Sequence, residues 1–409
     1  MTSRRQIIKM GAAAAGTLAA GPFLVRSAAA AQTIKFGLLT DFSGPLAQTG
    51  NYQSLGMQLA IDTLNASGGL LGQKIEVIKY DAQSNVQLYT QYAQQLVLKD
   101  QVAVVHGGVT SASREAIRPI FDRAQTLYFY DTEYEGGVCD RNTFLTDTTP
   151  MQTISKLIPF AMKQSGKKVY IVTADYNYGQ ILAKWVTHYV GQEGGQIIGT
   201  ELFPLDATNF SSSISKIQRA APDLVVSVLV GSNQQGFYRQ WEAAGMKRKI
   251  PIASATFGQA NELRTMPIAS TDGIMVAYNY FETLDNAANR RFAPAIHQRQ
   301  GAAQTEICES ISTPYEAVMI WGAAVKQAGS VQRDKVIAAL ESNLSIDGPS
   351  GKVTVDPHTH HTIRDIYLAQ ARGGKWNIVQ TFPAQPPGDS GGECDLLKNP
   401  RTNKQFLVM

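Results

Sequence analysis

Four short segments of the sequence combine hydroxyl or amide side chains with tyrosines or glycines, and each follows a stretch that predicts a β-strand. Hydroxyl and amide groups direct hydrogen bonds to a small polar ligand, and glycine lets a ligand approach the backbone closely. These residue types therefore favour recognition of a small polar molecule. The four segments are residues 107–111 (GGVTS), 130–134 (YDTEY), 175–178 (DYNY) and 231–234 (GSNQ).

Ser111 has three interpretations: a nucleophile, the cap of a helix, or a ligand-binding hydroxyl at a helix start. A nucleophilic serine needs a histidine and an acid beside it, and the sequence assigns neither partner. We favour ligand binding over a plain helix cap. Thr132, Tyr176 and Tyr178 have an alternative interpretation as turn residues, and their shared position at predicted strand ends favours binding.

Motifs for nucleotide, dinucleotide and hydrolase sites do not occur in the sequence. The patterns sought were G-x-x-x-x-G-K-[ST], G-x-G-x-x-G and G-x-S-x-G. We therefore expect no cofactor, and an enzyme is disfavoured. Histidines cluster at residues 358–361 (HTHH), where exposed loop histidines are favoured over a metal site because no carboxylate or cysteine ligand set is evident nearby. His106 ends an apolar run and is predicted to be a partly buried histidine with its hydrogen bonds satisfied.

Short apolar runs alternate with amphipathic stretches through much of the chain, which predicts repeated βα units and parallel sheets. Two such series imply an α/β fold with two lobes, each a mostly parallel sheet flanked by helices. Ligands bind such sheets at the carboxyl ends of the strands, so the four polar segments line a cleft between the lobes. The predicted strands are 33–40, 74–80, 102–106 and 127–130 in the first series, and 168–173, 196–202, 224–230 and 250–254 in the second.

The first 31 residues have the three-part layout of an export signal: Arg4-Arg5, an uncharged stretch over residues 10–25, and alanines ending at Ala31. The paired arginines indicate the twin-arginine type. The uncharged stretch is short for a membrane anchor, so we expect cleavage near residue 31 and a soluble periplasmic chain with no membrane insertion. The whole sequence has 37 Lys and Arg against 33 Asp and Glu, and removal of the segment leaves 33 of each. Nucleic acid is therefore an improbable partner.

Three cysteines are present, without a C-x-x-C pair, which gives no zinc or redox motif. An oxidising compartment allows one disulfide and one buried thiol. Cys139 and Cys394 lie in loop-like surroundings rich in glycine and aspartate, whereas Cys308 leads into a predicted helix. We favour a Cys139–Cys394 pair, although sequence does not fix the connectivity.

A series of motifs in the same order resembles one family. These are FGLLTDFSGP at 36–45, AID at 60–62 with NASGGLLG at 65–72, G-x-x-x-S-x-x-R at 107–114, Y-x-T-x-Y-E-G at 130–136, DYNY at 175–178, and DGP at 347–349. The chain resembles the periplasmic solute-binding proteins of ABC importers of the branched-chain amino acid type, closest to their urea- and short-chain-amide-binding branch. The resemblance covers nearly the whole chain after the signal.

The resemblance implies a type I periplasmic-binding-protein fold with a ligand cleft between two lobes. Lobe 1 is expected to comprise residues 32–148 and 273–344, and lobe 2 residues 149–272 and 345–409 with the C-terminal tail. It implies ligand contacts from Ser111, Tyr130, Thr132 and Tyr178, with Gly231 and Thr256 as further candidates from lobe 2. No metal ligand is implied.

The implied function is capture of a small polar solute by lobe closure and delivery to the permease subunits of an ABC importer, with urea or a short-chain amide favoured. A branched-chain or other amino acid, or a small organic acid, is the alternative ligand. A ligand sensor or a periplasmic enzyme is a less favoured function.

Two acids depart from the pattern of the urea and amide branch. Asp131 stands where many of its members have proline, and Glu133 where a neutral residue is common. Because side chains of a strand alternate in direction, Tyr130 and Thr132 facing the cleft would turn Asp131 away from it, and Glu133 likewise if the strand continues. A neutral ligand is therefore expected, and Asp131→Asn is expected to leave ligand affinity nearly unchanged.

Overall fold

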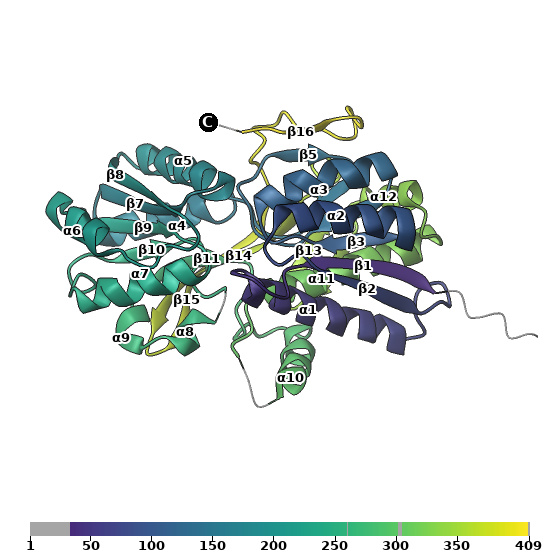
Figure 1. The fold of residues 1–409 in the computed structure, drawn as a ribbon, viewed down its shortest axis with the longest axis horizontal. Coiled ribbons are helices and arrows are strands. Elements are labelled where there is room, and N and C mark those ends of the chain that lie inside the picture. The colour runs from purple at the N-terminus through teal and green to yellow at the C-terminus, as the bar shows by residue number, and fades with distance from the viewer. Residues whose placement is uncertain (1–32, 260, 302–304, 408–409) are drawn as a thin grey trace, which may run out of the picture. The chain divides into compact units, whose positions relative to one another are not determined.

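The first sheet is built from five parallel strands, with helices in the connections between the first four of them (Figure 1). The computed structural model describes residues 33–259, 261–301 and 305–407, so the predicted signal peptide lies outside the described residues. The strand order is β2-β1-β3-β4-β6. The strands are β1 (Ile34–Thr40), β2 (Ile75–Asp81), β3 (Val104–Gly107), β4 (Leu127–Tyr130) and β6 (Thr143–Leu145), and the helices are α1 (Ala47–Ala66), α2 (Val86–Gln95) and α3 (Ser111–Ala124).

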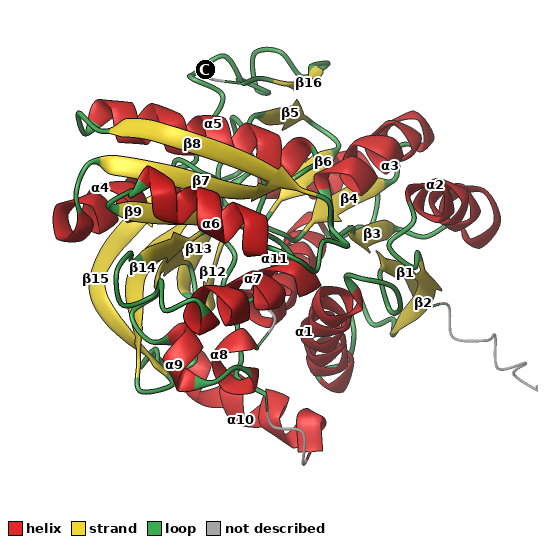
Figure 2. Cartoon of the chain, turned by 60° about the vertical axis from the view of Figure 1, so that its left-hand side comes forward, coloured by secondary structure: helices red, strands yellow, loops and turns green. Residues whose placement is uncertain are grey.

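The second sheet also has a parallel centre, and antiparallel strands extend it on one side (Figure 2). Its order is β12-β13-β14-β11-β10-β9-β7-β8, with β15 paired to β14. The strands are β7 (Lys168–Ala174), β8 (Gln196–Phe203), β9 (Leu224–Val228), β10 (Ile252–Ser254), β11 (Met275–Tyr278), β12 (Ser345–Gly348), β13 (Gly351–Val355), β14 (Thr362–Arg372) and β15 (Lys375–Gln385). The helices are α4 (Ile154–Ser165), α5 (Asn177–Gln192), α6 (Ser211–Ala220), α7 (Ser232–Ala243), α8 (Glu262–Thr265) and α9 (Ile268–Thr271).

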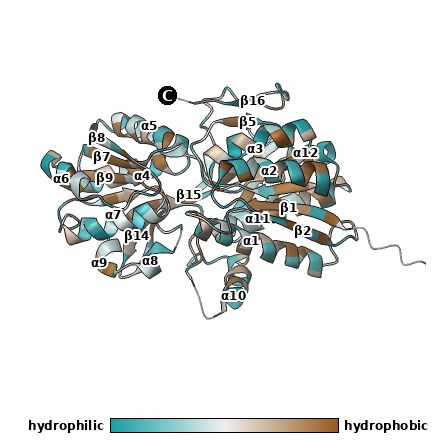
Figure 3. Cartoon of the chain, viewed as in Figure 1, coloured by the Kyte–Doolittle hydropathy of each residue, from teal (hydrophilic) through white to brown (hydrophobic). Residues whose placement is uncertain are grey.

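The central strands are buried on both faces. Their sequences are therefore continuous apolar runs, without the alternation of apolar and polar residues that a half-exposed strand shows. All five residues of β9, LVVSV, are buried. Apolar clusters pack on the two faces of each sheet, and Figure 3 shows hydrophobic strands at the centre of each lobe and hydrophilic residues on its helices. The chain thus forms the predicted two-lobed α/β fold.

The chain crosses between the lobes after β11, and this corrects the predicted boundaries. We expected residues 273–344 in lobe 1, but β11 pairs with β10 and β14 of the second sheet. Three helices then pack on lobe 1, with α11 lying along α1. Val353 and Val355 of β13 join the same core as Phe36 of β1, although residues from 345 onward were expected in lobe 2. The helices are α10 (Asn289–Gln300), α11 (Glu309–Ala328) and α12 (Arg333–Leu340).

The C-terminal tail returns to lobe 1 as well. Strand β16 (Asn403–Gln405) pairs antiparallel with β5 (Val138–Asp140), and Cys139 forms a disulfide with Cys394. The tail was expected with lobe 2, whereas the disulfide of the favoured cysteine pair, between positions 255 residues apart, ties it to lobe 1. Within the described part of the chain, no helix has the length and apolar character needed to cross a membrane.

Candidate functional site

The predicted polar segments follow parallel strands in both lobes. In lobe 1, β3 ends at Gly107 and α3 begins at Ser111, while β4 ends at Tyr130. Thr110 caps α3 by accepting a hydrogen bond from the backbone N–H of Ser113. In lobe 2, α5 and α7 begin shortly after the ends of β7 and β9. Three of the four segments are therefore held between a strand and a helix start, whereas residues 130–134 lead into β5 (Val138–Asp140).

The hydroxyl of Ser111 is bound within lobe 1. Its Oγ donates to the buried carboxylate of Glu135 and accepts from Nη1 of Arg114 at 3.3 Å. A hydroxyl has a single O–H, so Ser111 retains only acceptor capacity toward a ligand.

The hydroxyl groups of Thr132 and Tyr130 also donate their hydrogen bonds within lobe 1. Thr132 Oγ1 donates to the carbonyl of Gly108 at 3.0 Å and accepts from Nε2 of Gln53 at 2.6 Å. The hydroxyl of Tyr130 donates to the carbonyl of Val109 at 3.1 Å. The structure therefore brings these predicted residues together around one loop, where their O–H groups fix the loop and their remaining lone pairs are suited to N–H donors.

The two acids of the same segment point in different directions. Asp131 is fully buried, with its carboxylate 2.9 Å from Nδ1 of His106 and accepting from Thr146 Oγ1 at 2.6 Å. Glu133 instead contacts the hydroxyl of Tyr178 in α5, across the two lobes. Glu133 was expected to turn away only if the strand continued, and because β4 ends at Tyr130 strand alternation does not apply to it.

Glu133 belongs to a set of side chains that we call the cross-lobe network: Tyr178, Glu133, Gln259 and Glu309. The side chain of Gln259 interacts with Glu133, and its Nε2 donates to Oε1 of Glu309 at 2.7 Å. The other carboxylate oxygen of Glu309 is buried and has no hydrogen-bond partner among the described residues. Gln259 and Glu309 were not among the predicted ligand contacts, and the sequence signal for them is an acid at the start of the apolar helix α11 (Glu309–Ala328).

Burial raises the pKa of the acids in and near this network. It raises the pKa of Glu133 to about 8, with the charge of Asp147 adding to the effect and the Tyr178 hydroxyl opposing it. Burial raises the pKa of Asp147 to about 7, although Arg364 opposes the shift. Burial and the neighbouring acids Asp147 and Glu133 raise the pKa of Glu309 well above its usual range. At neutral pH, Glu133 is thus mainly a neutral carboxylic acid with one donor and one acceptor.

Gly231 and Thr256 lie at strand ends of lobe 2. A side chain at Gly231 would meet Leu46 and Pro45, so this glycine lies against the loop of lobe 1 that precedes α1. Thr256 Oγ1 donates to the carbonyl of Leu229 at 2.5 Å and accepts from Nε2 of Gln234 at 3.2 Å. The carbonyl of Thr256 accepts a hydrogen bond from the backbone N–H of Gln259 at 3.5 Å, which links this strand end to the cross-lobe network. Gly231 and Thr256 both stay predicted ligand contacts.

The histidine cluster does not form a common site. His360 and His361 are buried, although exposed loop histidines were expected, and their rings bind Glu341 and Tyr134 respectively. His358 lies 3.1 Å from Asp395 instead. His106 is also fully buried, beyond the partial burial predicted. Among the residues that the structure describes, no three histidine, cysteine or acidic side chains are grouped to hold a metal ion.

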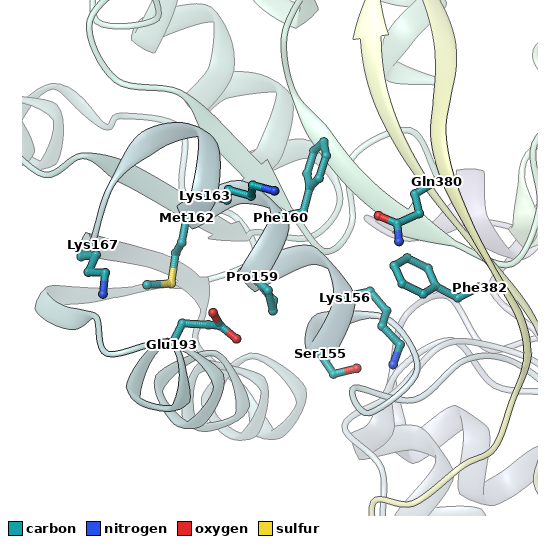
Figure 4. Close-up of a pocket in the computed structure, with 10 residues that line it drawn as sticks. All are labelled: Ser155, Lys156, Pro159, Phe160, Met162, Lys163, Lys167, Glu193, Gln380 and Phe382. Carbon is teal, nitrogen blue, oxygen red and sulfur yellow. The ribbon is translucent and has the colours of Figure 1, made fainter.

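A groove of about 510 Å³ lies on lobe 2, between α4, the end of α5 and β15 (Figure 4). Its lining includes Lys156, Lys163, Lys167 and Glu193. Lys156 lies over the ring of Phe382, 5.5 Å from its centroid. None of the predicted ligand-binding residues lines this groove, so it is separate from the candidate site.

The chain is similar to known proteins over most of its length. Residues 33–375 match the family described as periplasmic binding protein. The Leu/Ile/Val-binding protein homolog 7 of Brucella abortus (strain 2308) is 25% identical over 346 residues, which cover 80% of this chain and 85% of that protein.

Two solved structures share the fold. A solute binding protein of an ABC transporter from Rhodopseudomonas palustris BisB5, in complex with 3,4-dihydroxy benzoic acid, has a TM-score of 0.78 at 23% identity and covers 87% of this chain and 98% of that one. An amino acid ABC transporter substrate-binding protein from Pseudomonas fluorescens Pf-5 has a TM-score of 0.77 at 20% identity, over 90% and 100% of the two chains.

Proposed function

The chain belongs to the periplasmic binding protein family and is a substrate-binding protein of an ABC transporter, and we propose that it captures a small neutral solute rich in N–H donors. Urea or a short-chain amide is the favoured class. Its relatives and structural neighbours are solute-binding proteins rather than enzymes. Export by a twin-arginine signal with cleavage near residue 31 is part of the same proposal, and the permease subunits of the importer are the expected partners.

The observation that carries this proposal is the carboxyl group of Glu133 facing Tyr178 across the lobes. A protonated carboxyl group presents an O–H donor beside a C=O acceptor, which matches the C=O and N–H groups of an amide. Ser111 and Thr132 add acceptor lone pairs, since their O–H groups already bind Glu135 and Gly108. An amide or urea supplies the N–H groups that these acceptors need.

The same arrangement disfavours an anion. Burial raises the pKa of Glu309, and the neighbouring acids Asp147 and Glu133 raise it further. A bound carboxylate would add a further negative charge to this dry region, where an unpaired buried charge is costly. The benzoic acid derivative bound by the Rhodopseudomonas palustris protein is therefore a poor guide to the ligand here.

A second candidate is a solute with a cationic amino group, such as an amino acid. It is favoured by Oε2 of Glu309, which has no hydrogen-bond partner among the described residues, and by the acid Asp147 among the groups that shift the pKa of Glu133. A cation in this network would lower the pKa of Glu133, and that carboxyl group would then release its proton.

Lobe closure follows from the position of the network. Glu133 lies in lobe 1, whereas Tyr178 lies in α5 of lobe 2. A ligand that contacts both residues makes its full set of interactions only when the lobes are closed. It therefore shifts the equilibrium toward the closed form by its differential affinity for the two states.

Three ligands of the same shape separate the candidates: acetamide, acetamidinium and acetate. We expect calorimetry of the mature chain at pH 7 to show binding of acetamide with no net proton exchange, and no binding of acetate. Acetamidinium is expected to bind only if the second candidate holds, with release of a proton that titrations in two buffers of different ionisation enthalpy detect. Acetate binding more tightly than acetamide would contradict the proposal.

A further inference from the structure

A buried carboxylate lies behind the Ser111 hydroxyl. Glu135 is fully buried and accepts hydrogen bonds from Ser111 Oγ and, at 2.7 Å, from Nη2 of Arg114. The guanidinium of Arg114 lies over the rings of Tyr130 and Tyr134, 5.0 and 4.5 Å from their centroids. Glu135 thus joins the start of α3 to the segment after β4, which are two of the four predicted ligand-binding segments.

The third donor to Glu135 comes from the other end of the chain. Nε2 of Gln405 donates to Oε1 of Glu135 at 2.8 Å and to the carbonyl of Gly136 at 2.9 Å. Gln405 is held in register by β16, where it pairs with Val138 of β5, and the next backbone N–H, of Phe406, donates to Gly137 at 2.7 Å. The tail therefore contacts the binding loop through both side chain and backbone.

The backbone of Glu135 also receives a bond from lobe 2. Nε1 of Trp185, in α5, donates to its carbonyl at 2.9 Å. Tyr178, in the same helix, contacts Glu133. The segment from Glu133 to Glu135 is therefore held from lobe 2 on one side and from the C-terminal tail on the other.

We propose that Gln405 is a positioning residue of the ligand site: it holds the Glu135 carboxylate, which in turn fixes the direction of the Ser111 hydroxyl and the course of the loop that carries Thr132 and Glu133. The effect on ligand affinity rests on the proposed function, whereas the effect on the loop does not. The C-terminal tail is on this view part of the binding apparatus.

Asn403 provides a matched control, because it lies two residues away on the same strand and binds Arg118 and Asp122 but not Glu135. Hydrogen exchange of the ligand-free protein is measured for the wild type, Gln405→Ala and Asn403→Ala. The readout is the backbone amides of Tyr134 and Val138, which donate to Thr148 and to the Tyr134 hydroxyl. Gln405→Ala is expected to speed their exchange about tenfold, the effect of losing one hydrogen bond to a charged group. Asn403→Ala should leave it near the wild-type rate.

Gln405→Met separates a hydrogen-bonding role from simple space filling. Methionine is an unbranched side chain of similar length to glutamine but donates no hydrogen bond, so exchange of these amides should be faster than in the wild type, as in Gln405→Ala. A space-filling role would leave exchange in Gln405→Met near the wild-type rate.

Calorimetry with acetamide as the probe completes the test, with an expected loss of affinity of about tenfold for Gln405→Ala and little change for Asn403→Ala. Equal exchange rates in the two alanine variants would overturn the role of Gln405, whatever acetamide does. Faster exchange only in Gln405→Ala, together with no binding of acetamide or urea by the wild type, would support the positioning role and contradict the proposed ligand class.

Discussion

Asp131 shows how far a single residue's role depends on burial. It departs from the pattern of the urea and amide branch, yet its carboxylate lies against His106 and Thr146, away from the cross-lobe network. The carboxylate of Asp131 therefore binds groups in the interior of lobe 1, and a substitution at this position is a buried one.

We predict that Asp131→Ala lowers the free energy of unfolding by about 1 to 3 kcal/mol, because it leaves buried groups of His106 and Thr146 without their partner. Asp62→Ala is the control, since Asp62 forms an exposed pair with Arg299 that contributes about 0 to 1 kcal/mol. Thermal unfolding at neutral pH measures both variants. Equal losses in the two would show that Asp131 is not the buried partner described here.

Glu133 makes stability depend on pH. The unfolded chain loses this proton near the ordinary value of 4.5, whereas the folded chain keeps it until about 8. Between these values the folded state binds more protons, so the contribution of Glu133 to stability falls as pH rises.

Glu133→Gln removes this pH-dependent contribution. We therefore predict that the free energy of unfolding of the variant, relative to that of the wild type, increases as the pH rises from 5 to 8. Thermal unfolding at several pH values measures the difference in free energy of unfolding between variant and wild type, because urea is itself a proposed ligand. A difference that stays constant across this range would contradict the raised pKa of Glu133.

Residue-level sequence reasoning was limited by distance along the chain. Alternation placed Asp131 away from the cleft, as its contacts with His106 and Thr146 show. Strand alternation does not extend to Glu133, because β4 ends at Tyr130. No local pattern predicts that Glu309 lies beside Gln259, because Glu309 begins α11, which packs on lobe 1, whereas Gln259 follows β10 of lobe 2.

At the scale of elements, the crossing of α1 and α11 organises lobe 1. A Cβ added at Gly56 of α1 would lie 2.0 Å from the carbonyl oxygen of Ile311, so only glycine permits this approach. Trp321 of α11 packs in the same core as Met57 of α1. The close approach of the two helices thus depends on one missing side chain.

We predict that Gly56→Ala lowers the free energy of unfolding by at least 1 to 3 kcal/mol, the usual cost of overpacking a core. The matched control is Gly191→Ala in α5, where an added Cβ meets nothing within 4 Å. That change is expected to stabilise the chain by about 0.4 to 1 kcal/mol. Thermal unfolding shows whether each variant is more or less stable than the wild type. A Gly56→Ala variant that is more stable than the wild type would refute the described crossing of α1 and α11.

The parallel elements were predictable because burial on both faces leaves a local signature. The apolar runs at 33–40 and 127–130 correspond to β1 (Ile34–Thr40) and β4 (Leu127–Tyr130). The short strands β5, β6 and β16 were missed, since strands of three residues have no periodicity to detect. Their positions follow from pairing with distant partners.

For the molecule as a whole, the Cys139–Cys394 disulfide closes a long loop that includes lobe 2. We predict that the double variant Cys139→Ser, Cys394→Ser unfolds with a free energy lower by about 2 to 5 kcal/mol, because the unfolded chain is no longer constrained. Thermal unfolding without reductant measures the loss. If wild type in reductant and the double variant both matched the oxidised wild type, the tail would not be anchored as described.

The most direct test of the ligand site is the dissociation constant of acetamide for the wild type, Glu133→Gln and Glu133→Ala. The glutamine keeps a donor beside an acceptor, so its dissociation constant is predicted to stay within about threefold of wild type. The alanine removes both groups, and its dissociation constant is predicted to rise about tenfold or more, as expected for losing paired hydrogen bonds in a closed cleft. Equal dissociation constants in all three proteins, or no binding of acetamide to the wild type, would contradict a site in which Glu133 meets the ligand between the lobes.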